Sequence, residues 1–228
     1  MKKALIIAAH PDDDILGCAG VISKYRNSVE FRVIFIAEGS SCRFNYEQTQ
    51  QAEFQNIIDE RNAFGIKALE LLGLKNYFFY NLACGRLDQF PILEINKIIE
   101  NEIKNFKPDT VFTHSFDDTN NDHIIVHRAT QMATRPGSFL FVNTVFAYEV
   151  LSSSEWRFTH TFLPNYFEVL SENDINNKWL SLKEYESEIK DFPYPRSEEG
   201  VFLLAKYRGM QCGSRYAEAF QLIRKIKV

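Results

Sequence analysis

The segment HPDDD, from His10 to Asp14, places one imidazole and three consecutive carboxylates directly after a short apolar run. Adjacent carboxylates repel each other and resist burial, so a turn of this composition needs a compensating cation. A divalent metal ion is the simplest cation to propose, because imidazole and carboxylate groups are common zinc ligands and a neighbouring carboxylate can act as a base. Pro11 stiffens the loop and fixes His10 relative to the aspartates. The segment therefore indicates a hydrolytic metal site.

A second imidazole is needed, and the chain has five histidines: His10, His114, His123, His127 and His160. We expect His123 to supply this imidazole, as a third metal ligand in addition to those from HPDDD. Asp122 is then a carboxylate partner for the other ring nitrogen of His123 or for a neighbouring group. His127 lies four residues further on. We favour a packing role for it over a role in contacting one of the metal ligands. His114 ends an expected strand, so contact with substrate and packing in the core both stay open. His160 is interpreted as structural or exposed.

Strand-like and helix-like segments alternate along the chain, which favours an α/β fold with a mostly parallel sheet covered on both faces. We expect strands at 4–8, 31–37, 77–80, 110–114, 145–150 and 166–170, and helices at 15–25, 48–72, 91–106, 176–190 and 197–212. In such sheets, ligands bind beyond the carboxyl ends of the strands. HPDDD, EGSSCR (38–43) and HSFDDTNNDH (114–123) all follow expected strands. We therefore expect three loops to meet in one crevice.

Composition and charge limit the function classes. The 228 residues, of which 45% are hydrophobic, suffice for a large core, and we expect one domain spanning 1–228. A formal net charge of −4 gives no support for general nucleic-acid binding. Neither a signal peptide nor a transmembrane segment is indicated, so we expect a cytoplasmic protein, for which a homo-oligomer stays open. The four scattered cysteines are interpreted as reduced packing residues: Cys18, Cys42, Cys84 and Cys212.

Three segments in order resemble the LmbE-like, PIG-L family of zinc-dependent N-deacetylases: AAHPDDDILGCAG, DDTNNDH and PYPRSEEGVFLLAKYRGMQCGSRYAEAF. The similarity extends over nearly the whole chain. It implies a Rossmann-like three-layer α/β fold, one Zn²⁺ ion and removal of acetyl from an N-acetylglucosamine-type amino sugar. Carried onto this sequence, the family pattern makes His10, Asp13 and His123 the zinc ligands. The same pattern makes Asp12 the general base that activates the attacking water.

Two positions depart from the family pattern. The family loop usually ends in glutamate, whereas this one ends in Asp14, a shorter acid whose hydrogen bonds behind the ligands differ. Some members place a histidine three residues before the ligand histidine, where it stabilises the oxyanion. Here that position is Asn120, which can donate a hydrogen bond but carries no positive charge.

The substrate contacts and the reaction class are more open. Arg43, Arg61 and Arg196 resemble arginines of the family, and we take Arg43 and Arg61 as substrate-binding candidates, with a structural ion pair as the alternative. The expected substrate is an N-acetylglucosamine-type sugar attached to a larger group. A metal-dependent phosphoesterase could use Asp117 and Asp118 for a second metal. A non-catalytic sugar-binding module of the same fold is disfavoured, because it has no use for a free base.

Overall fold

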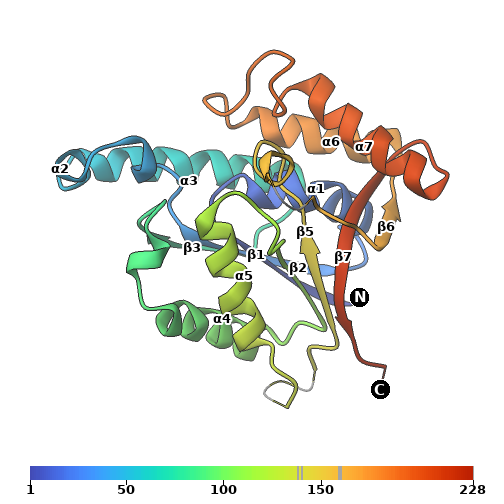
Figure 1. Ribbon diagram of the computed structural model, residues 1–228, viewed down its shortest axis with the longest axis horizontal. Helices are drawn as coiled ribbons and strands as arrows, with labels where there is room; N and C mark the ends of the chain where they lie inside the picture. The colour runs from blue at the N-terminus through green and yellow to red at the C-terminus, as the bar shows by residue number, and fades with distance from the viewer. Residues whose placement is uncertain (138, 140, 159–160, 228) are drawn as a thin grey trace.

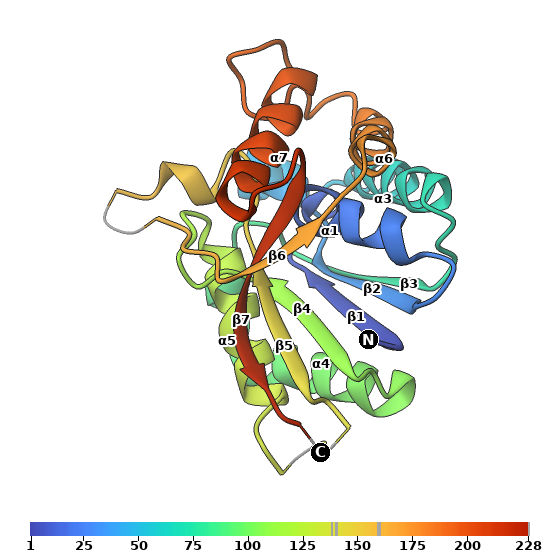
Figure 2. The ribbon, with the colours of Figure 1, turned by 90° about the vertical axis from the view of Figure 1, so that its right-hand side faces the viewer.

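The computed structural model describes residues 1–137, 139, 141–158 and 161–227, so the interpretation of His160 lies outside the described residues. Within them, seven strands form one sheet in the order β3-β2-β1-β4-β5-β7-β6 (Figures 1 and 2). Their bounds are β1 Lys3–Ala8, β2 Glu30–Ala37, β3 Tyr77–Leu82, β4 Thr110–His114, β5 Thr144–Tyr148, β6 Tyr166–Val169 and β7 Ala217–Lys225. Strands β1 to β5 pair in parallel, and β7 pairs antiparallel with both β5 and β6.

Helices cover both faces of the sheet, which confirms the expected three-layer α/β fold. Their bounds are α1 Asp13–Tyr25, α2 Tyr46–Thr49, α3 Phe54–Leu71, α4 Ile92–Phe106, α5 Asn121–Ala133, α6 Glu172–Lys183 and α7 Glu198–Cys212. Helices α1, α3, α6 and α7 lie on one face, and α4 and α5 lie on the other (Figures 1 and 2). In the described part of the chain, no helix combines the length and the apolar composition that crossing a membrane requires.

Strand β1 shows how the sequence produces these layers. Ala4, Ile6 and Ala8 pack in the core beneath α1 and α3, whereas Leu5 and Ile7 pack beneath α4 and α5. All five side chains are fully buried. Successive strand residues point to opposite faces, so a strand covered on both sides is apolar throughout. The carboxyl end of this buried strand therefore delivers HPDDD to a fixed place at the sheet edge.

The helix expected at 48–72 is wrong in its first turns, because α2 and α3 are separate helices. Asn45 and Gln48 form a capping box that starts α2, and α2 ends at Thr49. The next four residues form turns, and α3 begins at Phe54. Residues 51–53 are exposed, so no core contact holds them in a continuous helix.

The helix expected at 176–190 begins earlier and ends earlier. It starts at Glu172 because the side chains of Ser171 and Asp174 cap each other's backbone N–H groups. It ends at Lys183, which leaves 184–197 as a loop that carries Glu188 and Arg196 toward the sheet edge. The last expected helix is confirmed in α7, and the side chain of Ser197 caps it by accepting from the Gly200 N–H.

Strand β7 was not predicted. It inserts between β5 and β6, and its second half, QLIRK, is partly exposed and contains polar residues. The segment therefore lacks the apolar run by which the other strands are recognised. The remaining expected strands and helices match the structure to within two residues at each end.

Candidate metal centre and active site

The loops after β1 and β2 and the loop before α5 meet in one crevice of about 180 Å³ at the carboxyl edge of the sheet. Its walls include His10, Asp12, Asp13, Arg43, Asn120 and His123. Three further segments complete it: the turn after β3 at Cys84, the segment after β5 at Ser152 and Ser153, and the loop 184–197. The meeting of three distant loops agrees with the sequence analysis, since the carboxyl ends of parallel strands share one edge.

The three predicted ligands lie together. His10 Nδ1 is 3.3 Å from Asp13 Oδ2, and His123 Nε2 is also 3.3 Å from that oxygen. One donor atom from each residue lies within 4.8 Å of the other two, and all three residues are buried. Donors at about 2.0–2.1 Å from a tetrahedral zinc ion lie about 3.3 Å from one another. The donor set therefore fits a zinc ion with one open coordination position.

Each of the two imidazoles is oriented by a second carboxylate. His10 Nε2 lies 3.0 Å from Asp122 Oδ2, and His123 Nδ1 lies 3.1 Å from Asp118 Oδ1. Carboxylates in these positions fix which ring nitrogen carries the proton and leave the other nitrogen for a metal. Asp122 was expected to pair with His123 or a neighbour, and the structure places it on His10. Asp118 was considered only as a ligand for a second metal, so its place behind His123 was missed.

Both orienting carboxylates are themselves held in place. Asp118 accepts hydrogen bonds from Ser153 Oγ and, at 2.7 Å, from Ser154 Oγ. Burial raises the pKa of Asp118, but the contacts with His123 and the serines outweigh it and lower the pKa to about 2. Asp122 accepts from the backbone N–H groups of Gly85 at 2.6 Å and Leu87 at 3.2 Å. Asp118 is therefore ionised at neutral pH and Asp122 is fixed by backbone donors.

In the metal-free protein the two imidazoles are strong bases. Burial alone would lower the pKa of His10, but its bonds to Asp122 and Asp13 outweigh burial and raise the pKa to about 10. For His123 the charges and bonds of Asp13 and Asp118 likewise outweigh burial and raise the pKa to about 9. A metal ion that binds these nitrogens must displace protons from them.

Asp12, the predicted base, lies beside this cluster in a strained backbone conformation. Its φ is 115° and its ψ is −26°, a region that side-chain-bearing residues rarely adopt. Asp12 Oδ2 accepts from Arg61 Nη2 at 2.6 Å and from Arg196 Nη1 at 2.7 Å. In the described part of the chain, both ion pairs of Asp12 thus engage Oδ2 and not Oδ1.

Gly39 allows the loop after β2 to approach this strained turn. Its φ is +76°, and a Cβ atom there would lie 3.1 Å from Pro11 Cδ and 3.3 Å from Arg61 Nε. A side chain would therefore meet both the backbone penalty and a steric one. The contact fixes the EGSSCR loop, and with it Arg43, against the HPDDD turn.

The two predicted substrate-binding arginines lie in different environments. Arg61 is 4% exposed and bonds to Asp12, to the Pro11 carbonyl and to Glu188 Oε1 at 2.8 Å. This is the ion-pair alternative raised from the sequence. The side chain of Arg43 is 47% exposed and lies 2.5 Å from the same Glu188 oxygen. Arg43 is thus the one of the two that faces solvent, and Glu188, which joins them, carried no signal in the sequence.

His114 and Asn120 also differ from each other. His114 is fully buried, accepts from the Ala9 N–H at 2.8 Å and stacks on His123 with ring centroids 4.0 Å apart. It supports His123 from behind and does not line the crevice, so the structure gives it the packing role. Asn120 Oδ1 caps α5 by accepting from the Asp122 N–H at 2.9 Å. The amide therefore turns its Nδ2 donor away from the helix.

Asp14 is buried and, among the described residues, neither of its carboxyl oxygens has a hydrogen-bond partner. Burial and the charge of Asp12 raise the pKa of Asp14 to about 8. The shorter acid thus stays protonated at neutral pH behind the ligands. His127, for which packing was favoured, is partly buried and contacts the His114 carbonyl through Nδ1 at 2.8 Å.

The interpretation of all four cysteines as packing residues is wrong for Cys42, whereas Cys84 packs in the core beneath α4 and α5. Cys42 is exposed, Cys84 is buried, and both line the crevice as free thiols. The neighbouring Cys84 thiol and the charge of Arg43 lower the pKa of the Cys42 thiol. The 42-residue separation hid the pair, which forms only when the loops after β2 and β3 pack together.

The family model for PIG-L, described as GlcNAc-PI de-N-acetylase, matches residues 5–134. The chain belongs to the PIG-L family. Membership makes it an amide hydrolase of the deacetylase class, as the motifs predicted. The matched residues include the HPDDD turn and the segment that carries Asp118, Asp122 and His123.

Two curated relatives are deacetylases by name. The uncharacterized deacetylase YaiS of Escherichia coli (strain K12) is 28% identical over 195 residues, which cover 82% of this chain and 91% of that protein. The diacetylchitobiose deacetylase of Thermococcus kodakarensis is 23% identical over 231 residues, which cover 98% of this chain and 84% of that protein.

Solved structures agree on the fold. The N,N'-diacetylchitobiose deacetylase of Pyrococcus horikoshii has a TM-score of 0.74 at 20% identity, covering 98% of this chain and 84% of that chain. The 4-carboxy-2-hydroxymuconate hydratase GalB of Pseudomonas putida KT2440 has a TM-score of 0.73 at 20% identity, covering 100% and 98%. One fold thus serves more than one reaction, and the site residues must carry the functional argument.

Proposed function

We propose that the chain is a zinc-dependent N-deacetylase that removes acetyl from an N-acetylglucosamine-type sugar joined to a larger group. The observation that carries the proposal is the convergence of His10, Asp13 and His123 beside a separate carboxylate, Asp12. Two imidazoles and one carboxylate leave a tetrahedral zinc ion one open position, which is the arrangement of a catalytic rather than a structural site. Family membership supplies the amide chemistry.

Each residue of the crevice has a separate role in this proposal. Zinc, when bound, supplies a Lewis acid that polarises the acetamide carbonyl and lowers the pKa of water. Asp12 accepts a proton from the attacking water through Oδ1 and returns it to the leaving amine. Arg61 and Arg196 keep Asp12 in one orientation through Oδ2. Asn120 Nδ2 donates to the developing oxyanion, so the products are acetate and a free amino sugar.

The charge at the mouth of the crevice supports a conjugated substrate. Arg43 is exposed and is neutralised by Glu188, which it shares with Arg61 and Arg196. Three guanidinium groups thus surround one carboxylate, and an anion or hydroxyl cluster on the attached group can replace part of that contact with Arg43. We assign Arg43 to direct contact with the attached group and Arg61 to an action on the substrate through Asp12.

The phosphoesterase alternative requires a second metal, for which Asp117 and Asp118 were the spare acids. Both Asp118 oxygens already have partners: Oδ1 contacts His123 and Ser153, and Oδ2 contacts Ser154. Ligation of a second ion by Asp118 would release His123 from its orienting contact. The geometry therefore favours a single catalytic metal.

The test measures zinc content and acetate release together. We expect about one zinc ion per chain for a three-ligand catalytic site. His10→Ala should lose that zinc, whereas His127→Asn, at a histidine that does not line the crevice, should keep it. Wild-type zinc content in the His10→Ala protein would overturn the ligand set.

Substrate preference is measured separately. Acetate release from free N-acetylglucosamine should be slow compared with release from at least one conjugate in a panel of nucleotide-linked, lipid-linked and glycan-linked forms. Remote contacts orient the acetamide, so removing the attached group should lower kcat as well as affinity. Equal kcat/KM values for the free sugar and every conjugate would contradict the preference for a conjugated substrate. They would not contradict deacetylation itself.

A further inference from the structure

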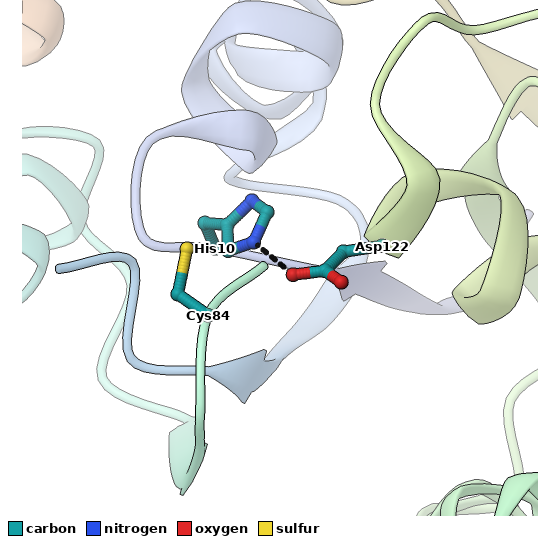
Figure 3. Close-up of side chains that lie close together, drawn as sticks. All are labelled: His10, Cys84 and Asp122. Atoms are coloured by element: carbon teal, nitrogen blue, oxygen red, sulfur yellow. Dashed lines mark hydrogen bonds and ion pairs between the residues drawn. The ribbon is translucent and has the colours of Figure 1, made fainter. Parts of the chain in front are cut away.

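A second group of metal-binding side chains lies beside the catalytic ligands. Figure 3 shows His10, Cys84 and Asp122, with the dashed line marking the 3.0 Å contact between His10 Nε2 and Asp122 Oδ2. One donor atom from each of the three residues lies within 4.8 Å of the other two. Their exposed fractions are 7% for His10, 4% for Cys84 and 0% for Asp122. The group is thus as compact and as buried as the catalytic one.

The two groups share only His10, and they use opposite nitrogens of its ring. Nδ1 faces Asp13 at 3.3 Å, and Nε2 faces Asp122 at 3.0 Å. The catalytic group contains nitrogen and oxygen donors, whereas the second adds the sulfur of Cys84. A thiolate favours zinc, cadmium and cobalt over magnesium or calcium, so the second group selects softer divalent ions.

A fourth donor is at hand. Cys42 lines the crevice beside the turn that carries Cys84, because a Cβ atom on Gly85 would lie 3.0 Å from Cys42 Cβ. Cys42 is exposed, whereas Cys84 is buried. Glu38 holds the two loops together, because Oε1 accepts from the Cys84 N–H at 2.9 Å and Oε2 accepts from the Ser41 N–H at 3.0 Å. The exposed thiol therefore gives a metal ion a route from solvent to the buried donors.

We propose that Cys84, His10 and Asp122, completed by Cys42, form a second metal site whose occupation by excess Zn²⁺ inhibits the enzyme. Binding releases the thiol protons and the Nε2 proton of His10 to solvent, and forms metal–sulfur and metal–nitrogen bonds. It also withdraws Asp122 from His10 and engages Nε2, so the orientation that presents Nδ1 to the catalytic position is lost. The inhibition rests on the proposed function, whereas the metal binding does not.

Cobalt provides a readout that is independent of activity. The catalytic group has no sulfur, so the first equivalent of Co²⁺ should give visible bands without thiolate-to-cobalt charge-transfer absorption in the near ultraviolet. Further Co²⁺, added to the reduced protein, should develop that absorption. Cys84→Ser should abolish it, Cys42→Ser should weaken it, and the control Cys212→Ser, at a cysteine outside the crevice, should leave it unchanged. Unaltered visible bands with the first equivalent show that each variant is folded.

Inhibition is then compared in the same proteins. Cys84→Ser should raise the Zn²⁺ concentration for half-inhibition about 10-fold or more, the scale on which loss of a metal-orienting group weakens affinity. Failure of wild type to develop the charge-transfer absorption, or its persistence in Cys84→Ser, would overturn the site. If the wild-type protein kept full activity after the charge-transfer absorption had developed, the second site would not compete with the catalytic site for His10. Neither result would bear on the catalytic ligands, which the zinc content of His10→Ala tests.

Discussion

The contact between Asp118 and His123 gives the sharpest test of how the candidate metal centre is built. Asp118 is 1% exposed, and its Oδ1 lies 3.1 Å from His123 Nδ1. Asp118→Ala removes this ion-pair partner from the buried Nδ1 atom. Asp118→Asn keeps an oxygen at nearly the same place and removes only the charge.

The two substitutions should differ in size. Loss of a carboxylate that orients a metal-binding histidine weakens metal affinity by about 10- to 100-fold, which is about 1.4–2.8 kcal/mol. Asp118→Asn retains an acceptor for the Nδ1 proton, so we expect about 10-fold weaker zinc binding. Asp118→Ala removes both the charge and the oxygen beside Nδ1, so we expect about 100-fold.

Competition with a chromophoric chelator measures the zinc affinity of each purified variant, and urea unfolding shows whether the fold is retained. The matched control is Asp117→Asn, because Asp117 is the adjacent acid, is partly exposed, and contacts Ser115 through its backbone N–H. Wild-type affinity in Asp118→Ala would refute the orienting role. Equal losses in the Asp117 and Asp118 variants would instead favour a second metal held by both acids.

Three further predictions concern the ligands, the base and the substrate. Asp12→Asn should keep zinc and lower acetate release by roughly 100-fold or more, whereas Asp13→Asn should lose zinc; metal analysis and a stopped acetate assay separate the two. Arg43→Ala should raise KM for a conjugate and leave kinetics with the free sugar unchanged. Because the pKa is raised to about 10 for His10 and about 9 for His123 without metal, zinc binding near pH 7.5 should release about two protons. Zinc affinity should therefore rise with pH up to about 10, and calorimetry in buffers of different ionisation enthalpy measures the release.

The parts of the fold that the sequence predicted are those with strong local signals. Strand β1 is apolar from Ala4 to Ala8 because both of its faces are buried there, and α7 begins at Glu198 because the preceding Ser197 caps its first turn. Strand β7 has neither signal: its polar second half becomes a strand only by pairing with β5, and its first half pairs with β6. Its antiparallel insertion depends on contacts between distant segments, which periodicity does not report.

The same distinction applies to the candidate site. His10, Asp12 and Asp13 lie within four residues, so one turn brings their side chains to one place, and the motif could be read directly. Their partners come from far along the chain: Arg196 is 184 residues from Asp12. A lone glutamate or arginine in a loop has no spacing from which such a contact could be inferred, and Glu188 was missed for this reason.

The orientation of the imidazoles is set at the tertiary level as well. His10 presents Nδ1 to Asp13, whereas His123 presents Nε2 to the same oxygen. Neither choice follows from the spacing of the motif, because either nitrogen can bind a metal. Asp122 lies beyond His10 and Asp118 beyond His123, and each carboxylate binds the nitrogen that faces it. The motif thus identifies the donor residues, and the packing of α5 and its preceding loop against the HPDDD turn selects the donor atoms.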